Sequence, residues 1–219
     1  MPLVSESDIL HEMPAPASRP AGLAWDGEAL WASFEEPPGL CRIHPVSGEV
    51  LAELPLHGEG EPTGLEWAGG ALWLAFSNPA RILEVDPASG GVRRRLQPAG
   101  AGRIGGLAAD GAAGPTLWFA TCSPEGGRLH RLDARDAEPH KSLSVDPDAA
   151  GLAWDGRWLW VARAGTGQIL RIDPMFANVV AALAVDGAPT GLAWDGEALW
   201  AADRSGNRLL RLRVPNSPP

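Results

Sequence analysis

The chain has 219 residues, a hydrophobic content of 45% and a formal net charge of −9. This composition is that of a globular protein with one sizeable core, and the negative charge argues against nucleic acid or an anionic membrane surface as a partner. The sequence has no run of 18 apolar residues that would predict a membrane-spanning helix.

A ten-residue segment, GLAWDGEALW, begins at Gly22 and returns letter for letter at Gly191. Close copies begin at Gly64 and Gly151, and a more divergent copy begins at Gly106. Each copy opens by alternating small or polar residues with large apolar ones, which is the period of a strand. Asp-Gly follows in most copies and is a common signal for a tight hairpin. The segment therefore predicts a two-stranded hairpin that occurs five times.

The remainder of each copy predicts two further strands. In the second copy, residues 64–67 and 71–76 form the hairpin, residues 81–86 alternate as a third strand, and residues 92–96 form a fourth. Four short antiparallel strands in about 40 to 45 residues are typical of a propeller blade. We therefore expect an all-β, five-bladed β-propeller with almost no helix.

The five blades are predicted to form one domain, 1–219, in which the last blade is incomplete. The blade boundaries fall at about 20–55, 62–97, 104–145, 149–185 and 189–214. The last copy lacks a fourth strand, and residues 8–14 align with the fourth strand of the first copy at 49–55. We expect residues 8–14 to complete the last blade and close the ring, which would remove a free sheet edge.

Most of the repeated residues have a packing explanation. Gly22, Ala24 and their equivalents are small where the backbone of a neighbouring blade comes close, and the tryptophans fill the space between blades. An aromatic ligand platform is the alternative for the tryptophans. Functional residues are therefore sought where the copies differ.

The loops that precede the first strand and follow the second strand of each blade share one face, which we call the top face. Differences between the copies after the second strand give five candidate ligand-binding residues: Glu35, Cys122, Arg163, Asp203 and Arg204. The loops before the first strands add His11, Arg19, His57, Glu59, Glu61, Arg103, Asp146, Asp148 and Asp186. This acid-rich face is either an ordinary solvated rim or a ligand site at the channel mouth, where Arg163 and Asp203 could pair with each other or with a polar ligand.

Glu66 is a further difference, since the other four copies have Ala at its position. A carboxylate near a narrow axis would be partly desolvated, which raises its pKa and suits it to act as a general base. The alternative is a structural carboxylate bonded to Thr63 or to water. Cys122 is either a nucleophile or an idle thiol. No ligand spacing for a metal and no cofactor motif is present, so neither is expected.

On the opposite face, Pro174, Met175 and Phe176 replace the polar turns of the other blades. They predict either a protein contact or a local packing feature.

The blade pattern, GLAWDG, then LW-A, then RI-DP-(S/T)G, resembles the NHL-like and streptogramin-lyase-like propellers, especially at residues 199–212. The blade count and the copy GLEWAGGALW are also similar to the glutamine cyclotransferase family. In that family a Glu usually precedes the blade glycine, whereas this chain has Ala21, Thr63, Gly105, Ala150 and Thr190 there. The resemblance implies the scaffold, and Glu66 is the one residue that fits the cyclotransferase pattern.

Two functions follow from the sequence. The first is a non-catalytic binding propeller whose acidic top face takes a small polar or cationic ligand or a partner loop. The second is a cyclotransferase-like or lyase-like enzyme, with Glu66 as acid and base and with Arg163 and Asp203 orienting the substrate. We expect a monomer. Arg far outnumbers Lys and Tyr is absent, which suggests a GC-rich bacterial genome. No secretory signal is visible, so we expect a cytoplasmic protein, although a chain trimmed of its signal would look the same.

Overall fold

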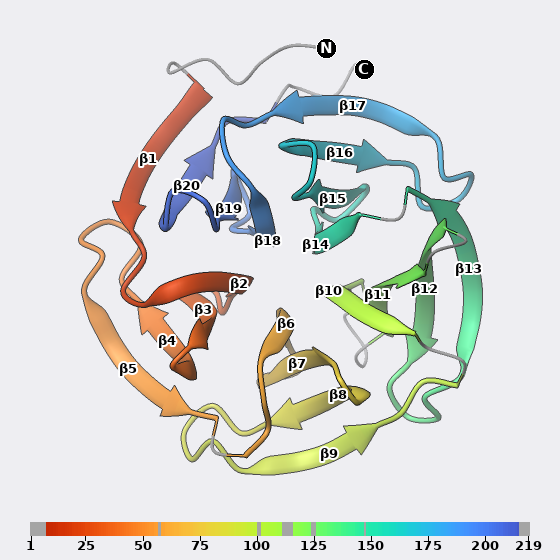
Figure 1. The fold of residues 1–219 in the computed structure, drawn as a ribbon, viewed down its shortest axis with the longest axis horizontal. Coiled ribbons are helices and arrows are strands. Elements are labelled where there is room, and N and C mark those ends of the chain that lie inside the picture. The colour runs from red at the N-terminus through yellow and green to blue at the C-terminus, as the bar shows by residue number, and fades with distance from the viewer. Residues whose placement is uncertain are drawn as a thin grey trace.

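The computed structural model describes residues 8–56, 58–99, 102–110, 116–123, 126–146 and 148–214. These residues form five four-stranded antiparallel sheets around a central axis (Figure 1). The prediction of an all-β, five-bladed propeller is confirmed, and no α-helix occurs in the described part of the chain. The strands are β1 (Ile9–Pro14), β2 (Ser18–Trp25), β3 (Leu30–Glu36), β4 (Pro38–Ile43), β5 (Val50–Pro55), β6 (Pro62–Ala68), β7 (Ala71–Ser77), β8 (Ala80–Val85), β9 (Val92–Leu96), β10 (Arg103–Ala109), β11 (Thr116–Ser123), β12 (Gly126–Asp133), β13 (Pro139–Val145), β14 (Ala149–Trp154), β15 (Leu159–Arg163), β16 (Gln168–Ile172), β17 (Val179–Ala184), β18 (Pro189–Trp194), β19 (Leu199–Asp203) and β20 (Arg208–Leu212).

The blades follow one another in chain order, and the N-terminal strand closes the ring. Blade one comprises β2 to β5, blade two β6 to β9, blade three β10 to β13, blade four β14 to β17, and blade five β18 to β20 with β1. Strand β1 pairs antiparallel with β20, with Glu12 opposite Leu210 and Met13 opposite Leu209. Met13 is buried in the core between blades five and one. The predicted closure is therefore confirmed.

The hydrophobic core lies in the five seams between adjacent blades, each with its own cluster of buried residues. The second tryptophan of every copy is buried in these seams: Trp31, Trp73, Trp118, Trp160 and Trp200. This burial confirms that these tryptophans have a packing role. Each contributes several kcal/mol, at about 25 cal/mol per Å² of apolar area removed from water.

The glycine that opens each copy is required by the closeness of the neighbouring blade. A Cβ atom on Gly64 would lie 2.6 Å from the carbonyl oxygen of Gly105, and one on Gly191 would lie 2.6 Å from that of Ala21. Real Cβ atoms essentially never approach this closely. The repeated glycines therefore let the inner strands approach one another around the axis.

The Asp of the Asp-Gly turn has a second role that the sequence does not reveal. Asp26 accepts hydrogen bonds from the Trp31 indole Nε1 at 2.9 Å and from Arg42 Nε at 2.6 Å. Blades three and five repeat the arrangement with Asp110 and Asp195. Because this Asp–Trp–Arg contact joins strands two and three to the hairpin turn, it stabilises the bottom of these three blades.

Candidate functional site

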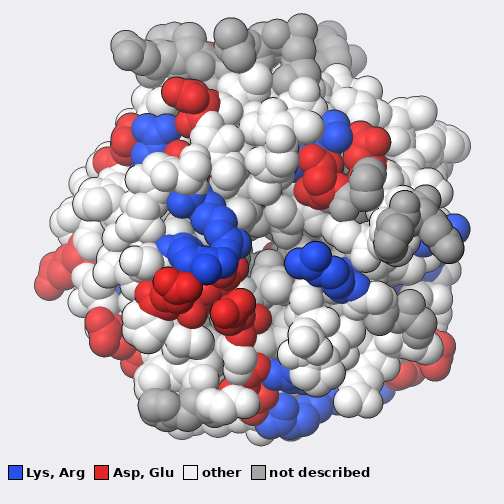
Figure 2. Space-filling model, viewed as in Figure 1, with Lys and Arg blue, Asp and Glu red and all other residues white. Residues whose placement is uncertain are grey.

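The top face is hollowed into a polar funnel of about 1060 Å³ that all five blades line. Arginines and carboxylates gather around this central depression (Figure 2). Its floor is formed by the residues that precede the glycine of each copy: Ala21, Thr63, Gly105, Ala150 and Thr190. The position where the cyclotransferases usually carry a Glu is therefore on the floor, and here it carries only small side chains. Charge enters the funnel from its walls.

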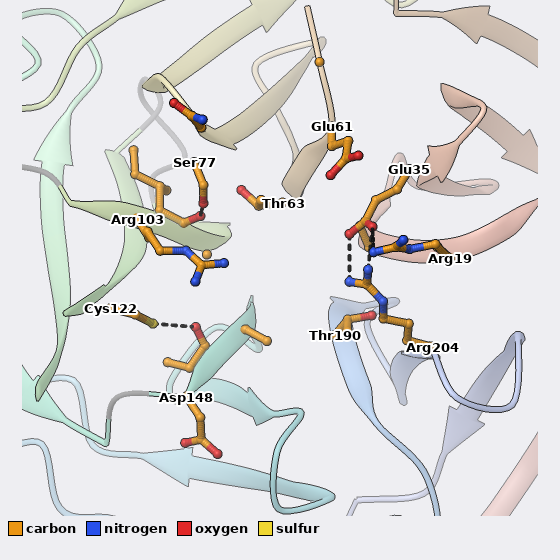
Figure 3. A pocket seen from close by; sticks show the side chains of 17 residues that line it. Arg19, Glu35, Glu61, Thr63, Ser77, Arg103, Cys122, Asp148, Thr190 and Arg204 are labelled. Carbon is orange, nitrogen blue, oxygen red and sulfur yellow. Dashed lines mark hydrogen bonds and ion pairs between the residues drawn. The ribbon is translucent and has the colours of Figure 1, made fainter. Parts of the chain in front are cut away.

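One wall is an ion-pair cluster across the seam between blades five and one. Arg204 donates from Nη1 to Glu35 Oε1 at 2.7 Å and from Nη2 to Glu35 Oε2 at 2.5 Å. Arg19 Nη2 lies 2.7 Å from the same Oε2 atom (Figure 3). Glu35 is nearly buried, and its negative charge raises the pKa of Arg19 above the usual value. Since two guanidinium groups occupy the Glu35 oxygens, this carboxylate is a fixed part of the wall.

The opposite wall comes from blades three and four and contains Arg103, Cys122 and Asp148. The exposed Arg103 side chain points into the funnel (Figure 3) and forms no ion pair with the residues that the structure describes. Burial raises the pKa of the Cys122 thiol, and the positive charge of Arg103 offsets this only in part. The thiol lies 3.6 Å from the carbonyl oxygen of Ala149, to which it donates. Cys122 is therefore a protonated lining residue rather than an activated nucleophile.

A carboxylate without an ion pair faces the funnel from blade two. Glu61 is exposed and points into the funnel (Figure 3), and it has no ion-pair partner in the described part of the chain. Together with Glu35 and Asp148, it balances the charges of Arg19, Arg103 and Arg204 in the lining. The funnel is thus mixed in charge rather than acid-rich, because arginines are drawn to the predicted acidic rim.

The structure brings three of the predicted ligand-binding residues together and separates the other two. Glu35, Cys122 and Arg204 line the funnel. Arg163 lies beside it, where its Nε donates to Asp148 at 2.6 Å and its Nη1 lies 3.1 Å from Asp146.

Asp203 is buried away from the funnel. It accepts hydrogen bonds from Arg208 Nε at 2.8 Å and from the backbone N–H of Ala188 at 2.9 Å. Arg163 and Asp203 therefore do not pair with each other, which was one of the two alternatives for them, because each has partners within its own blade.

Glu66 also lies outside the funnel lining, in the seam between blades two and three. Its Oε1 accepts from the backbone N–H of Trp67 at 2.7 Å, and its Oε2 accepts from that of Ala109 at 3.1 Å. Burial raises the pKa of Glu66 to about 8, although both N–H groups lower it. The third residue of the repeated segment, counted from its glycine, points toward the adjacent blade rather than the axis. Glu66, Arg163 and Asp203 therefore do not meet at one substrate atom.

Arg19, Glu61, Arg103 and Asp148, which the sequence places on the top face, also share one position in the repeat. Each stands three residues before the glycine of its blade, and Ala188 holds the same position in blade five. His57, another top-face candidate, lies outside the described residues. Within the described residues, no three His, Cys, Asp or Glu side chains gather as a possible metal site, and no helix is long and apolar enough to span a membrane.

The fold and the funnel define this chain as a five-bladed β-propeller with a mixed-charge central funnel on its top face. No protein-family model and no curated protein sequence matches it. Solved propellers do match its structure. The glutaminyl cyclase of Myxococcus xanthus has a TM-score of 0.77 and 16% identity, with 94% of each chain covered.

Two other solved structures are more distant. The calcium-binding protein regucalcin of Agrobacterium tumefaciens has a TM-score of 0.61 and 18% identity, over 94% of this chain and 92% of that chain. A streptogramin B lyase has a TM-score of 0.53 and 18% identity, over 93% of this chain and 69% of that chain. At these identities the likeness shows the fold alone, which confirms the scaffold-level resemblance that the sequence predicts.

Proposed function

We propose that this chain is a non-catalytic binding propeller whose funnel takes a small polar ligand that carries a cationic group. The observation that supports this best is the presence of two charged groups, Arg103 and Glu61, that point into the same polar funnel and have no ion pair among the described residues. Glu61 would accept from the cationic group, and Arg103 would donate to an anionic or carbonyl oxygen of the ligand.

The rest of the funnel suits this role. The small side chains of its floor leave room for a ligand, and its volume is at the upper end of the range for small-molecule sites. The Arg19–Glu35–Arg204 cluster holds one wall in a fixed geometry before a ligand arrives, which lowers the entropy cost of binding. A partner loop that carries the same charges is the other occupant that this geometry supports.

An enzyme of cyclotransferase or lyase type is the second candidate, and the structural similarity to the glutaminyl cyclase of Myxococcus xanthus favours it. That mechanism needs an available base beside the substrate. Glu66 lies in a seam, and the oxygens of Glu35 are occupied by two arginines. The carboxylate of Glu61 faces the funnel without an ion pair among the described residues, but it is exposed to water rather than desolvated beside a substrate. We therefore place binding ahead of catalysis.

A matched set of ligands tests the proposal. Thermal-shift and calorimetric titrations would compare glutamine with its N-acetyl derivative, which lacks the cation, and with its amide, which lacks the carboxylate. We expect the compounds that carry a cation to raise the melting temperature. Glu61→Gln and Arg103→Gln should each weaken binding about tenfold, which corresponds to about 1.4 kcal/mol. Arg157→Gln, on an exposed turn of the opposite face, should leave binding unchanged.

Three results would overturn the proposal. The first is the absence of a shift with every compound that carries a cation. The second is equal binding by wild type and both funnel variants. The third is conversion of a peptide with an N-terminal glutamine, with release of ammonia, which would establish the enzyme instead.

A further inference from the structure

Each blade ends in an outer strand with an open hydrogen-bonding edge, and one of these edges differs from the other four. The outer strands are β1, β5, β9, β13 and β17. Exposed edges are usually protected from pairing by charged side chains. Strands β1, β5, β9 and β13 contain charged or ionisable residues, namely Glu12, Glu53, Arg93 to Arg95 and Lys141. Strand β17 reads VVAALA and contains only Val, Ala and Leu.

The same segment carries an unusual exposed apolar surface. Met175 and Phe176, in the turn before β17, are each 66% exposed, and Val179 and Val180 are 55% and 42% exposed. Four of the eight large hydrophobic residues found exposed in the described chain thus lie between residues 175 and 180. Apolar residues concentrated in this way mark an interaction surface more often than single exposed ones do.

Strand β17 has the same register as the other outer strands. It lacks a protective charge because of its residues and not because of its backbone geometry. Val179 and Val92 occupy equivalent positions, since they pair with Ile172 and Val85 at the ends of the third strands. The next residue is Val180 in blade four and Arg93 in blade two. The scaffold therefore accommodates an arginine at the position that Val180 occupies.

We propose that β17 pairs antiparallel with β17 of a second copy of this chain, so that two blades join into one continuous sheet. An uncharged strand is complementary to itself about a two-fold axis, and the pairing satisfies backbone N–H and C=O groups at an edge that no described strand covers. Each chain has one such strand, so the contact closes at two copies. Strand β17 lies on the outer rim (Figure 1), so both funnels remain open. The dimer departs from the monomer that the sequence predicts.

The size of the contact sets the expected affinity. One six-residue strand with its turn is smaller than a standard interface, so we expect a dissociation constant of about 10 μM. Sedimentation equilibrium of the full chain from about 1 to 100 μM should show a mass that rises from 23.0 kDa toward twice that value. Hydrogen exchange of the β17 amides should slow over the same range.

Val180→Arg tests the contact, and Leu51→Arg is its matched control at the equivalent position of β5, which Glu53 already protects. Val180→Arg should weaken association at least tenfold and retain the wild-type melting temperature, whereas Leu51→Arg should associate as the wild type does. A monomer at every concentration, or a dimer that both variants retain, would overturn the proposal. Dimerisation that begins only after deletion of residues 215–219 would also overturn it, because those residues would then be the occupant of the edge.

Discussion

Replacement of Glu66 by Gln tests how the seam between blades two and three holds a carboxylate. The Glu66 oxygens accept from the backbone N–H groups of Trp67 and Ala109, and burial raises its pKa from 4.5 to about 8. Gln keeps the shape and one acceptor oxygen but does not ionise. One of the two backbone N–H groups loses its acceptor in Glu66→Gln at every pH, so it is the pH dependence of the difference between the two proteins that reports the free energy of placing a negative charge in this seam.

The sign and the size of the effect follow from the raised pKa. Between about pH 4.5 and 8 the folded protein binds a proton at Glu66 that the unfolded chain does not, so the free energy of unfolding falls as pH rises through this window. A shift of this size corresponds to at most about 5 kcal/mol. Because the side chain is partly exposed and water screens its charge, we expect about 2 to 3 kcal/mol.

Thermal unfolding of both proteins from pH 4 to pH 9, followed by circular dichroism, measures this difference. The melting temperature of the wild type should fall by about 5 to 10 °C relative to that of Glu66→Gln across the window. Glu28→Gln, which removes an exposed carboxylate from a turn of blade one, should follow the wild-type curve. If the curves of wild type and Glu66→Gln run parallel, Glu66 is not desolvated in this seam and the reasoning fails.

Three further predictions test the scaffold. Deletion of residues 1–14 removes β1 and should lower the melting temperature by about 10 °C or more, and unchanged melting and solubility would contradict the ring closure. Gly191→Ala should lower the free energy of unfolding in urea by about 2 to 3 kcal/mol, since its Cβ would lie 2.6 Å from a neighbouring carbonyl oxygen. In the control Gly39→Ala the nearest such contact is 3.5 Å, so the loss should be small. Asp195→Ala leaves the Trp200 indole without its acceptor and should lower the free energy of unfolding by about 2 to 4 kcal/mol in the same assay. A loss below about 0.5 kcal/mol would contradict the structural role of Asp195.

The fold could be predicted from the sequence because the same strand and turn pattern occurs five times. Five copies of one hairpin define the inner two strands, and the missing fourth strand of the last copy leaves a single segment able to complete it. The double role of Asp26 could not be predicted, because a turn signal does not reveal that the same carboxylate reaches the Trp31 indole. That contact depends on how strands two and three lie relative to the turn.

The site was predicted only in its location. The sequence assigns Glu35 and Arg163 to the same face, but which arginine reaches which carboxylate depends on the spacing of neighbouring blades. Arg204 crosses a seam to reach Glu35, whereas Arg163 is satisfied by Asp148. Glu66 is misleading for a similar reason, since strand periodicity gives the side of the strand but not whether that side faces the axis or a seam.

Part of the mixed charge of the funnel comes from one position that recurs in every blade. Three residues before the glycine, blades one to four carry Arg19, Glu61, Arg103 and Asp148, so the sign alternates from blade to blade. This alternation makes the electrostatic interactions between neighbouring blades favourable, since each charge lies beside one of opposite sign. After Glu35, Glu61 accordingly contributes to the raised pKa of Arg19. A ring of five cannot alternate completely, and blade five breaks the pattern with the neutral Ala188. Asp148 forms an ion pair with Arg163, and Arg19 forms one with Glu35. Glu61 and Arg103, on adjacent blades, are therefore the charges available to a ligand.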